Sequence, residues 1–306
     1  MNWLKSRAHS RAHAVLSHYL SGTAALLVQG AGERVRVLAF SQHENMQFSA
    51  DLLNRVAAEA GIKHSPLIAL LGQEHYQTMM VEAPSVPEDE IKSAIRWKVK
   101  DLLNFHIDDA VLDHLPVPGG SGHPPSLYVV AAQAQAVRAL VQPYHDAGLQ
   151  LDVIDIRETA QHNLAMRVAP ADYAVAVLHF DGENGLLTFS FGANLILSRR
   201  IEGRGASGEA LLDKVAMESQ RSVDYFERQY SWFPLAKLYL APAAQAQALL
   251  RRLSEYLPIG AESLDLGRVF DFTGQIQLQD TQVQNAAFHL LGAALRPGAE
   301  SSDTAR

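Results

Sequence analysis

The sequence contains no cysteine. This absence excludes a disulfide framework, a thiolate metal site and a cysteine nucleophile, and it fits a protein of a reducing compartment. No paired carboxylates, nucleophile elbow or Ser-His-Asp order stands out either. The sequence therefore speaks against an enzyme only through the absence of a catalytic pattern.

Positive charge and long apolar runs are also scarce. The formal net charge is -7 and no basic stripe is present, so a nucleic-acid partner is not expected. No apolar stretch approaches the roughly 20 residues of a membrane span. The stretch after Met1 is interrupted by Ser17, His18 and Gly22, which makes it a poor signal peptide. We therefore expect a cytoplasmic protein.

The chain is long enough for two domains. It has 306 residues, of which 48% are apolar and 19% charged, an ordinary globular composition. In the first half, short apolar runs typical of strands alternate with helical patterns. The expected strands are 24–29, 34–40, 66–72, 76–82, 126–132 and 151–156, and the expected helices are 49–61, 134–147 and 157–168.

A further helix is expected after residue 85. Ser85 and Glu88 have capping-box spacing, with Pro87 in the first turn. An apolar stripe follows at Ile91, Ile95, Val99 and Leu102, and residues 116–125 form a Gly/Pro-rich loop. The second half starts near residue 172. Its expected strands are 173–180, 186–191, 194–201 and 236–241, and its expected helices are 207–230, 243–256 and 282–296.

Four segments in this order resemble the PilM family, the actin-like cytoplasmic proteins of type IV pilus machines. The branch most similar to this chain is that of MshI, from the mannose-sensitive agglutinin (MSHA) pilus system. The segments are PSVPEDEIKSAIRWKVKDLLNFHIDDAVLDH (84–114), AAQAQAVRALVQPYHDAGLQLDVIDI (131–156), ESQRSVDYFERQY (218–230) and FHLLGAALRP (288–297).

The resemblance implies an α/β, actin-like fold with two lobes, a small inserted subdomain in the first lobe and a reduced second lobe. The first lobe would comprise 1–83 and 156–171, the insert 84–155, the second lobe 172–297, and 298–306 would be a disordered tail. It also implies a scaffold that binds the cytoplasmic tail of a PilN-like inner-membrane protein, together with other pilus assembly components. Membrane association would then be indirect.

Three turns of an actin-like fold carry ATP and its metal, and all three depart from the pattern here. The first should read Asp-x-Gly-Thr, but no aspartate precedes Gly22 and Thr23. The second reads His-Phe-Asp181-Gly182, which displaces the acid by two positions. The third should end in Gly-Gly to admit adenine, but Pro242 adds a ring there and removes an amide. We therefore expect no cofactor and no ATPase activity.

The second lobe also lacks a segment. Family members with a complete second lobe carry a helical subdomain that walls the adenine pocket, whereas here Gly203 and Arg221 are joined almost directly. A divergent ATPase with bound ATP and magnesium remains the alternative to the scaffold. An actin-like fold with an unrelated small ligand is a third possibility, without positive support beyond an empty cleft.

Three other patterns have ordinary interpretations. Residues 203–208 spell GxGxxG, but no acidic residue follows the next strand, which favours a flexible turn over a dinucleotide site. His9 and His13 have zinc-ligand spacing without a third ligand, which favours an exposed N-terminal arm, so no metal is expected. Trp3 beside Lys5 could touch a membrane or pack on the first sheet.

The resemblance also predicts where the partner binds. The insert should leave an apolar trough beside the first sheet, in which an extended peptide lies with its side chains in pockets. The expected lining, with the insert core as the alternative, is Val81, Pro84, Ile91, Ile95, Trp97 and Leu115.

Overall fold

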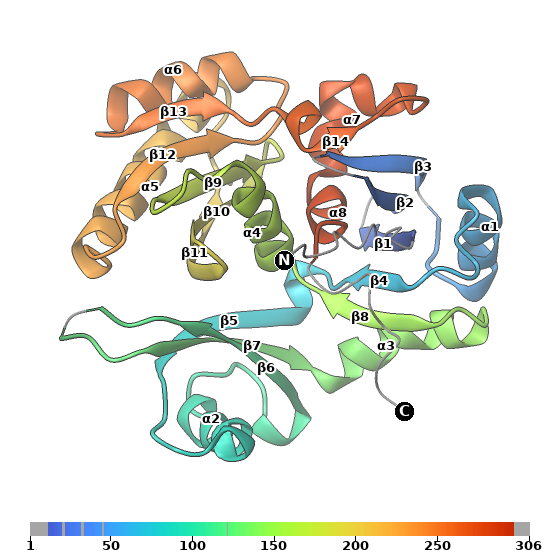
Figure 1. The fold of residues 1–306 in the computed structure, drawn as a ribbon, viewed down its shortest axis with the longest axis horizontal. Coiled ribbons are helices and arrows are strands. Elements are labelled where there is room, and N and C mark those ends of the chain that lie inside the picture. The colour runs from blue at the N-terminus through green and yellow to red at the C-terminus, as the bar shows by residue number, and fades with distance from the viewer. Residues whose placement is uncertain (1–11, 20–21, 32–33, 45, 121, 297–306) are drawn as a thin grey trace, which may run out of the picture.

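The computed structural model describes residues 12–19, 22–31, 34–44, 46–120 and 122–296. Three sheets organise these residues, and Figure 1 shows them as two lobes with a smaller unit below. The predictions for residues 1–11 and for the tail 298–306 lie outside the described residues.

The first lobe is built on a six-stranded sheet in the order β14-β3-β2-β1-β4-β8. Its strands alternate their side chains between two cores, as a pleated strand must. Val15 of β1 packs toward the helices in the middle of the molecule, whereas Ala14 and Leu16 pack toward the outer helices. The strands are β1 (His13–Tyr19), β2 (Gly22–Ala31), β3 (Arg34–Glu44), β4 (Leu67–Leu70), β8 (Leu151–Asp155) and β14 (Phe270–Asp271).

Strand β1 was not predicted, although it pairs with both β2 and β4 in the middle of this sheet. Both of its faces are buried, so its sequence shows no alternation of apolar and polar residues. The exposed arm expected around His13 is therefore wrong. His13 is 3% exposed, and its Nε2 lies 2.9 Å from the carbonyl oxygen of Ala294.

Helices cover both faces of the first-lobe sheet. The outer core contains α1 (Ala50–Ala60) and Tyr144 of α3 (Ala134–Asp146). α1 lies within the predicted range 49–61 and ends at Gly61, and the structure adds an N-cap at Ser49, whose hydroxyl accepts the Leu52 N–H. The inner core contains α4 (Arg157–Val168), which Figure 1 shows in the middle of the molecule.

The insert is a three-stranded antiparallel sheet in the order β5-β7-β6, covered by one helix. Its elements are β5 (Tyr76–Glu82), α2 (Ile91–Val99), β6 (Ala110–Val117) and β7 (Ser126–Gln133). The sheet pairing moves both boundaries that we expected at 84 and 155. β5 belongs to the insert because it pairs with β7, and β8 belongs to the first lobe because it pairs with β4.

The start of α2 differs from its prediction. Pro87 precedes a single 3-10 turn, and no side chain caps the helix, so Ser85 and Glu88 form no capping box. Ile95 and Val99 are buried as expected, but Leu102 lies beyond the helix and is 57% exposed.

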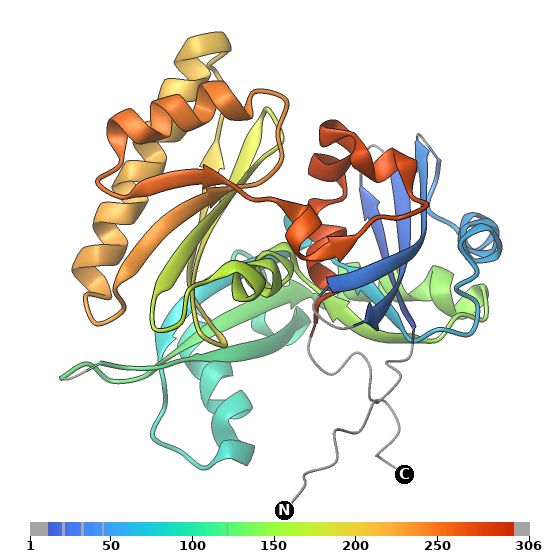
Figure 2. The same ribbon diagram turned by 45° about the horizontal axis from the view of Figure 1, so that its top comes forward.

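The second lobe is a mixed sheet in the order β11-β10-β9-β12-β13. α5 (Gly208–Gln229) and α6 (Ala246–Tyr256) cover its outer face (Figure 2), and α4 lies against the inner face. Residues 203–207 alone separate the antiparallel edge strand β11 from α5, in agreement with the reduced second lobe and against a dinucleotide-binding unit. The elements are β9 (Ala174–Phe180), β10 (Asn184–Phe191), β11 (Asn194–Glu202), α5 (Gly208–Gln229), β12 (Leu235–Leu240), α6 (Ala246–Tyr256) and β13 (Gly260–Ser263).

The end of the chain returns to the first lobe, so the second lobe does not extend to residue 297 as predicted. β14 pairs with β3, and the last helix packs beside α4 on the first-lobe sheet (Figure 1). The single helix expected over 282–296 is two short ones, α7 (Thr281–Ala286) and α8 (Phe288–Ala293). Phe288 and Leu291 are buried in the inner core of the first lobe. No helix in the described part of the chain is long and apolar enough to cross a membrane.

Candidate functional site

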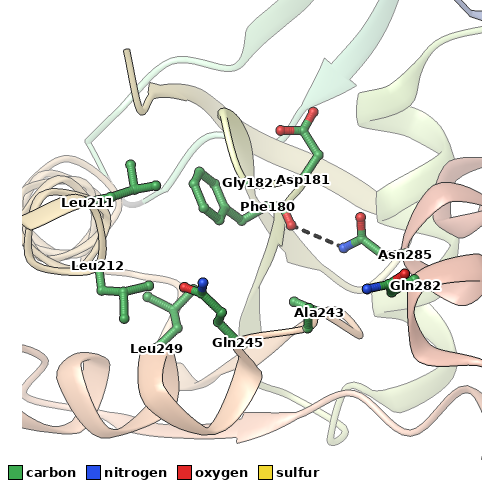
Figure 3. Close-up of a pocket in the computed structure, with 11 residues that line it drawn as sticks. Phe180, Asp181, Gly182, Leu211, Leu212, Ala243, Gln245, Leu249, Gln282 and Asn285 are labelled. Carbon is green, nitrogen blue, oxygen red and sulfur yellow. Dashed lines mark hydrogen bonds between the residues drawn. The ribbon is translucent and has the colours of Figure 1, made fainter. Parts of the chain in front are cut away.

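A pocket of about 360 Å³ lies beside the turn that opens the second lobe (Figure 3). Asp181 and Gly182 form one side of it, and Ala243 and Gln245, which follow β12, form another. Two of the three turns that were associated with a nucleotide from the sequence, the one at Asp181 and the one after β12, therefore border the same pocket. We call this the second-lobe pocket.

The lining of the second-lobe pocket is mostly apolar. Leu211 and Leu212 of α5 and Leu249 of α6 face it from the helical side, and Gln282 of α7 lies at the opposite wall (Figure 3). Asp181 is the charged residue among the described lining residues, and it is acidic. An acidic group in a lining whose described residues include no cationic side chain opposes the binding of a polyphosphate.

The carboxylate of Asp181 accepts hydrogen bonds within its own turn. Its Oδ1 accepts the backbone N–H groups of Glu183 at 2.9 Å and Asn184 at 2.7 Å. Gly182 has φ of 103°, a conformation that L side chains rarely adopt, so this glycine is required by the turn itself. Both residues thus have a structural reason to be present that needs no phosphate or metal.

Asn285 joins the turns around this pocket, a role that was not predicted from the sequence. Its Nδ2 donates to the carbonyl oxygens of Phe180 at 3.1 Å and Pro242 at 2.6 Å. Its own carbonyl oxygen lies 3.1 Å from Nε2 of buried His179. Pro242 therefore uses its carbonyl oxygen to anchor α7. Asn285 lies in the polar stretch TQVQN (281–285), so nothing in the sequence distinguished it from its polar neighbours.

Gly22 and Thr23 of the first hairpin also have structural roles. A Cβ on Gly22, whose φ is 148°, would lie 2.1 Å from the carbonyl oxygen of His43, so only glycine allows β2 and β3 to approach here. Thr23 is buried, and its hydroxyl lies 2.7 Å from Nδ1 of His18. Neither residue lines the second-lobe pocket.

The six residues predicted to line a partner trough do not come together. Val81, Ile91 and Ile95 share the core beneath α2, and Pro84 is half-buried in the link before that helix. Trp97 points outward, 73% exposed, with Nζ of Lys100 4.9 Å from its ring centre. The trough as we predicted it is therefore wrong in its residues, because three of them are core.

Leu115 lies elsewhere again. It packs against the second-lobe core and lines a pocket of about 260 Å³ together with Met166 of α4 and Leu195 of β11. β6 thus sends Leu112 to the core of the insert and Leu115 toward the second lobe, as its alternation requires.

A different pocket lies in the first lobe, beside the link that leads to the insert. It measures about 260 Å³, and we call it the first-lobe pocket. Leu70 and Phe48 of the first lobe face Ala139 and Leu140 of α3 across it. The link from β4 to the insert completes the wall with Gly72, Glu74 and His75. None of the six residues predicted to line a trough left by the insert belongs to this pocket.

His18 gives this pocket a rigid aromatic floor. Its ring stacks on Phe48 with 4.6 Å between ring centres, and Phe48 in turn meets Tyr144 edge-on. Burial lowers the pKa of His18, and the negative charge of Glu74 opposes this shift. The pocket therefore offers an apolar surface with one acidic side chain at its edge.

A buried carboxylate is hydrogen-bonded to Tyr76, the residue that follows the wall turn of this pocket. Glu158 of α4 is 0% exposed, and its Oε2 accepts a hydrogen bond of 2.5 Å from the hydroxyl of Tyr76. Burial raises the pKa of Glu158, and burial together with the Glu158 charge raises that of Tyr76. Arg200 of β11 approaches Glu158 Oε1 to 4.0 Å. This cluster connects both lobes and the insert, and none of its members was predicted from the sequence as a site residue.

Within the described residues, no group of three or more His, Asp or Glu side chains could hold a metal ion. His9 lies outside the described residues, and His13 is used in the core.

No family model matches the sequence, and no curated protein matches it. Among solved structures, the PilM-PilN type IV pilus biogenesis complex matches with a TM-score of 0.75 at 19% identity, over 94% of this chain and 99% of that chain. The cytoplasmic domain of EpsL, an inner membrane component of the type II secretion system of Vibrio cholerae, matches with a TM-score of 0.50 at 13% identity, over 90% and 94%.

A protein from Bacteroides thetaiotaomicron with an actin-like ATPase fold and unknown function matches with a TM-score of 0.51 at 8% identity, over 91% of this chain and 100% of that chain. These likenesses extend over nearly the whole length of both partners in each comparison. The chain therefore has an α/β, actin-like fold, as the sequence predicted.

Proposed function

We propose that this protein is a non-catalytic cytoplasmic scaffold of a type IV pilus assembly machine of the MSHA kind. It binds the cytoplasmic tail of a PilN-like inner-membrane protein and, through that tail, is held at the cytoplasmic face of the inner membrane. Other pilus assembly components meet it there. The main support is the likeness to a PilM-PilN complex over 94% of the chain, combined with the four sequence segments of the PilM pattern.

The chemistry of the second-lobe pocket supports a role without catalysis. Phosphoryl transfer depends on metal and cationic groups that neutralise charge around the phosphates. The described lining offers the Asp181 carboxylate and no cationic side chain, and that carboxylate closes its own turn. A divergent ATPase of the same machine is the second candidate, because the pocket adjoins two of the turns expected to carry a nucleotide.

The first-lobe pocket is the proposed site of the partner's tail. A short extended peptide would place an apolar side chain against Phe48 and Leu140, and a basic group beside Glu74. A site of this kind recognises a short linear segment, because one or two apolar anchors fill it while flanking charge fixes the direction.

The test uses a synthetic peptide with the N-terminal tail sequence of a PilN-like inner-membrane protein from the same genome. Fluorescence anisotropy should give binding at tens of micromolar or tighter. Ala139→Trp fills the pocket from the exposed side of α3 and should weaken binding at least about tenfold. Arg138→Trp, on the exposed neighbour that does not line the pocket, is the matched control and should bind as wild type. Folded protein that does not bind the peptide would contradict the proposed function.

A further inference from the structure

The turn between β4 and β5 takes part in two contacts at once. In the 3-10 turn η1 (Gln73–His75), Glu74 and His75 line the first-lobe pocket. The carbonyl oxygens of Gln73 and Tyr76 instead accept hydrogen bonds from Nη2 of Arg200, at 3.3 Å and 3.5 Å. One wall of the pocket is therefore held from behind by a side chain of the second lobe.

Arg200 is itself held in place. Its guanidinium carbon lies 5.5 Å from the ring centre of Tyr76, and its Nη2 lies 4.0 Å from Glu158 Oε1. That oxygen is buried and accepts no hydrogen bond from the described residues. A buried carboxylate oxygen is costly when no positive group compensates it, so any movement of Arg200 away from Glu158 is opposed.

These contacts join three bodies, namely β11 of the second lobe, α4 between the lobes, and the link that forms the pocket wall. We propose that Arg200 is a positioning residue for the first-lobe pocket. It sets the position of η1, so the affinity of the pocket for a peptide depends on where the second lobe stands. The identity of the peptide rests on the proposed function, whereas the control of the wall by Arg200 does not.

Because thermodynamic coupling between two sites is reciprocal, this arrangement would give the second lobe a function that needs no nucleotide. If the position of β11 changes the affinity of the pocket, a peptide in the pocket must shift the position of β11 by the same free energy. The actin-like pair of lobes would thus report occupancy of the first lobe to surfaces of the second.

The first experiment needs no partner. Amide hydrogen exchange of residues 72–76 is measured in the wild type, Arg200→Gln, Arg200→Lys and Arg199→Gln. Arg199 is the matched control, because it precedes Arg200 on β11 and instead lies over the ring of Tyr225, 4.5 Å from its centre. We expect exchange at least about fivefold faster in Arg200→Gln, a smaller change in Arg200→Lys, which keeps the charge opposite Glu158, and none in Arg199→Gln. Equal exchange in all four proteins would overturn the proposal.

The second experiment measures binding of the tail peptide to the same four proteins. Arg200→Gln should weaken binding about tenfold, with partial recovery in Arg200→Lys and no change in Arg199→Gln. Equal binding by wild type and Arg200→Gln would overturn the proposal and leave the proposed function standing. Failure of every protein to bind would refute the proposed function, and the exchange measurement would still judge the role of Arg200.

Discussion

The side-chain amide of Asn285 donates a hydrogen bond of 2.6 Å to the carbonyl oxygen of Pro242. The same nitrogen donates to the carbonyl oxygen of Phe180, so one side chain holds together the two turns that border the second-lobe pocket (Figure 3). Because Asn285 belongs to α7, the returning end of the chain fixes the geometry of a pocket in the other lobe.

Asn285→Ala should therefore destabilise the protein. Two half-buried carbonyl oxygens would lose their donor, which costs roughly 1–3 kcal/mol of unfolding free energy. Urea unfolding followed by circular dichroism measures this. Gln282→Ala, on the same helix and the same pocket but with an exposed side chain, is the control and should change the unfolding free energy by about 0.5 kcal/mol or less. Equal stability of the two variants would show that the contact does not hold the turns.

The protein should bind magnesium ATP no more tightly than about 100 µM, and it should not release phosphate in steady state. The first turn has no aspartate to organise the metal, and the acid of the second is used by Glu183 and Asn184. Titration calorimetry measures the affinity. Tighter binding, or phosphate release that is lost on Asp181→Ala, would favour the divergent ATPase.

Local patterns in the sequence sufficed for the regular elements. α1 shows its cap at Ser49 and its end at Gly61, and α5 has a long apolar stripe, so both could be predicted. β1 could not, because a strand buried on both faces has no alternation that marks it. The four resemblance segments then supplied the arrangement of lobes that periodicity alone could not give.

The residues that shape the two pockets were largely hidden from the sequence. Asn285 contacts Pro242 across 43 residues, and Arg200 contacts Gln73 across 127. No periodicity or spacing encodes such pairs, because they depend on how distant elements pack. The predicted trough failed for a related reason, since an apolar stripe such as Ile91 and Ile95 fits a helix core as well as a binding surface.

Acid should destabilise the protein. Burial lowers the pKa of His162 and of His179 to about 4, and that of His289 well below its usual value. The unfolded chain therefore takes up protons below about pH 6.5 that the folded chain does not, and stability is lost as pH falls from there toward 4. The loss is on the order of 1 kcal/mol per pH unit for each histidine.

Urea midpoints measured from pH 7.5 to 5.0 test this pH dependence. His162→Gln can keep a hydrogen bond to Ser190, which lies 2.8 Å from the imidazole, and should reduce the dependence by about one proton. His145→Gln, at an exposed position of α3, is the control and should leave it unchanged. If the urea concentration at the unfolding midpoint stays the same as the pH is lowered from 7.5 to 5.0, the prediction is contradicted.

Glu158→Gln should alter stability with the opposite dependence on pH. Burial raises the pKa of Glu158, so its contribution is fully present below the unfolded pKa near 4.5 and is lost as pH rises through the folded pKa. Glutamine still offers Tyr76 an acceptor oxygen but carries no charge. The variant should therefore gain stability relative to the wild type as pH rises from 4.5 to 8, and the gain should shrink again in acid.

Paired unfolding curves of wild type and Glu158→Gln at several pH values measure this difference. Arg200 adds a second prediction, because its guanidinium lies 4.0 Å from the carboxylate and compensates part of the buried charge. In an Arg200→Gln background, the stabilisation by Glu158→Gln at pH 8 should be larger than in the wild-type background, since the carboxylate has then lost one of its nearby cations and keeps Arg157. If Glu158→Gln raises the unfolding free energy equally in both backgrounds, Arg200 and Glu158 are not energetically coupled. Glu158 would then not hold Arg200 in its position beside η1.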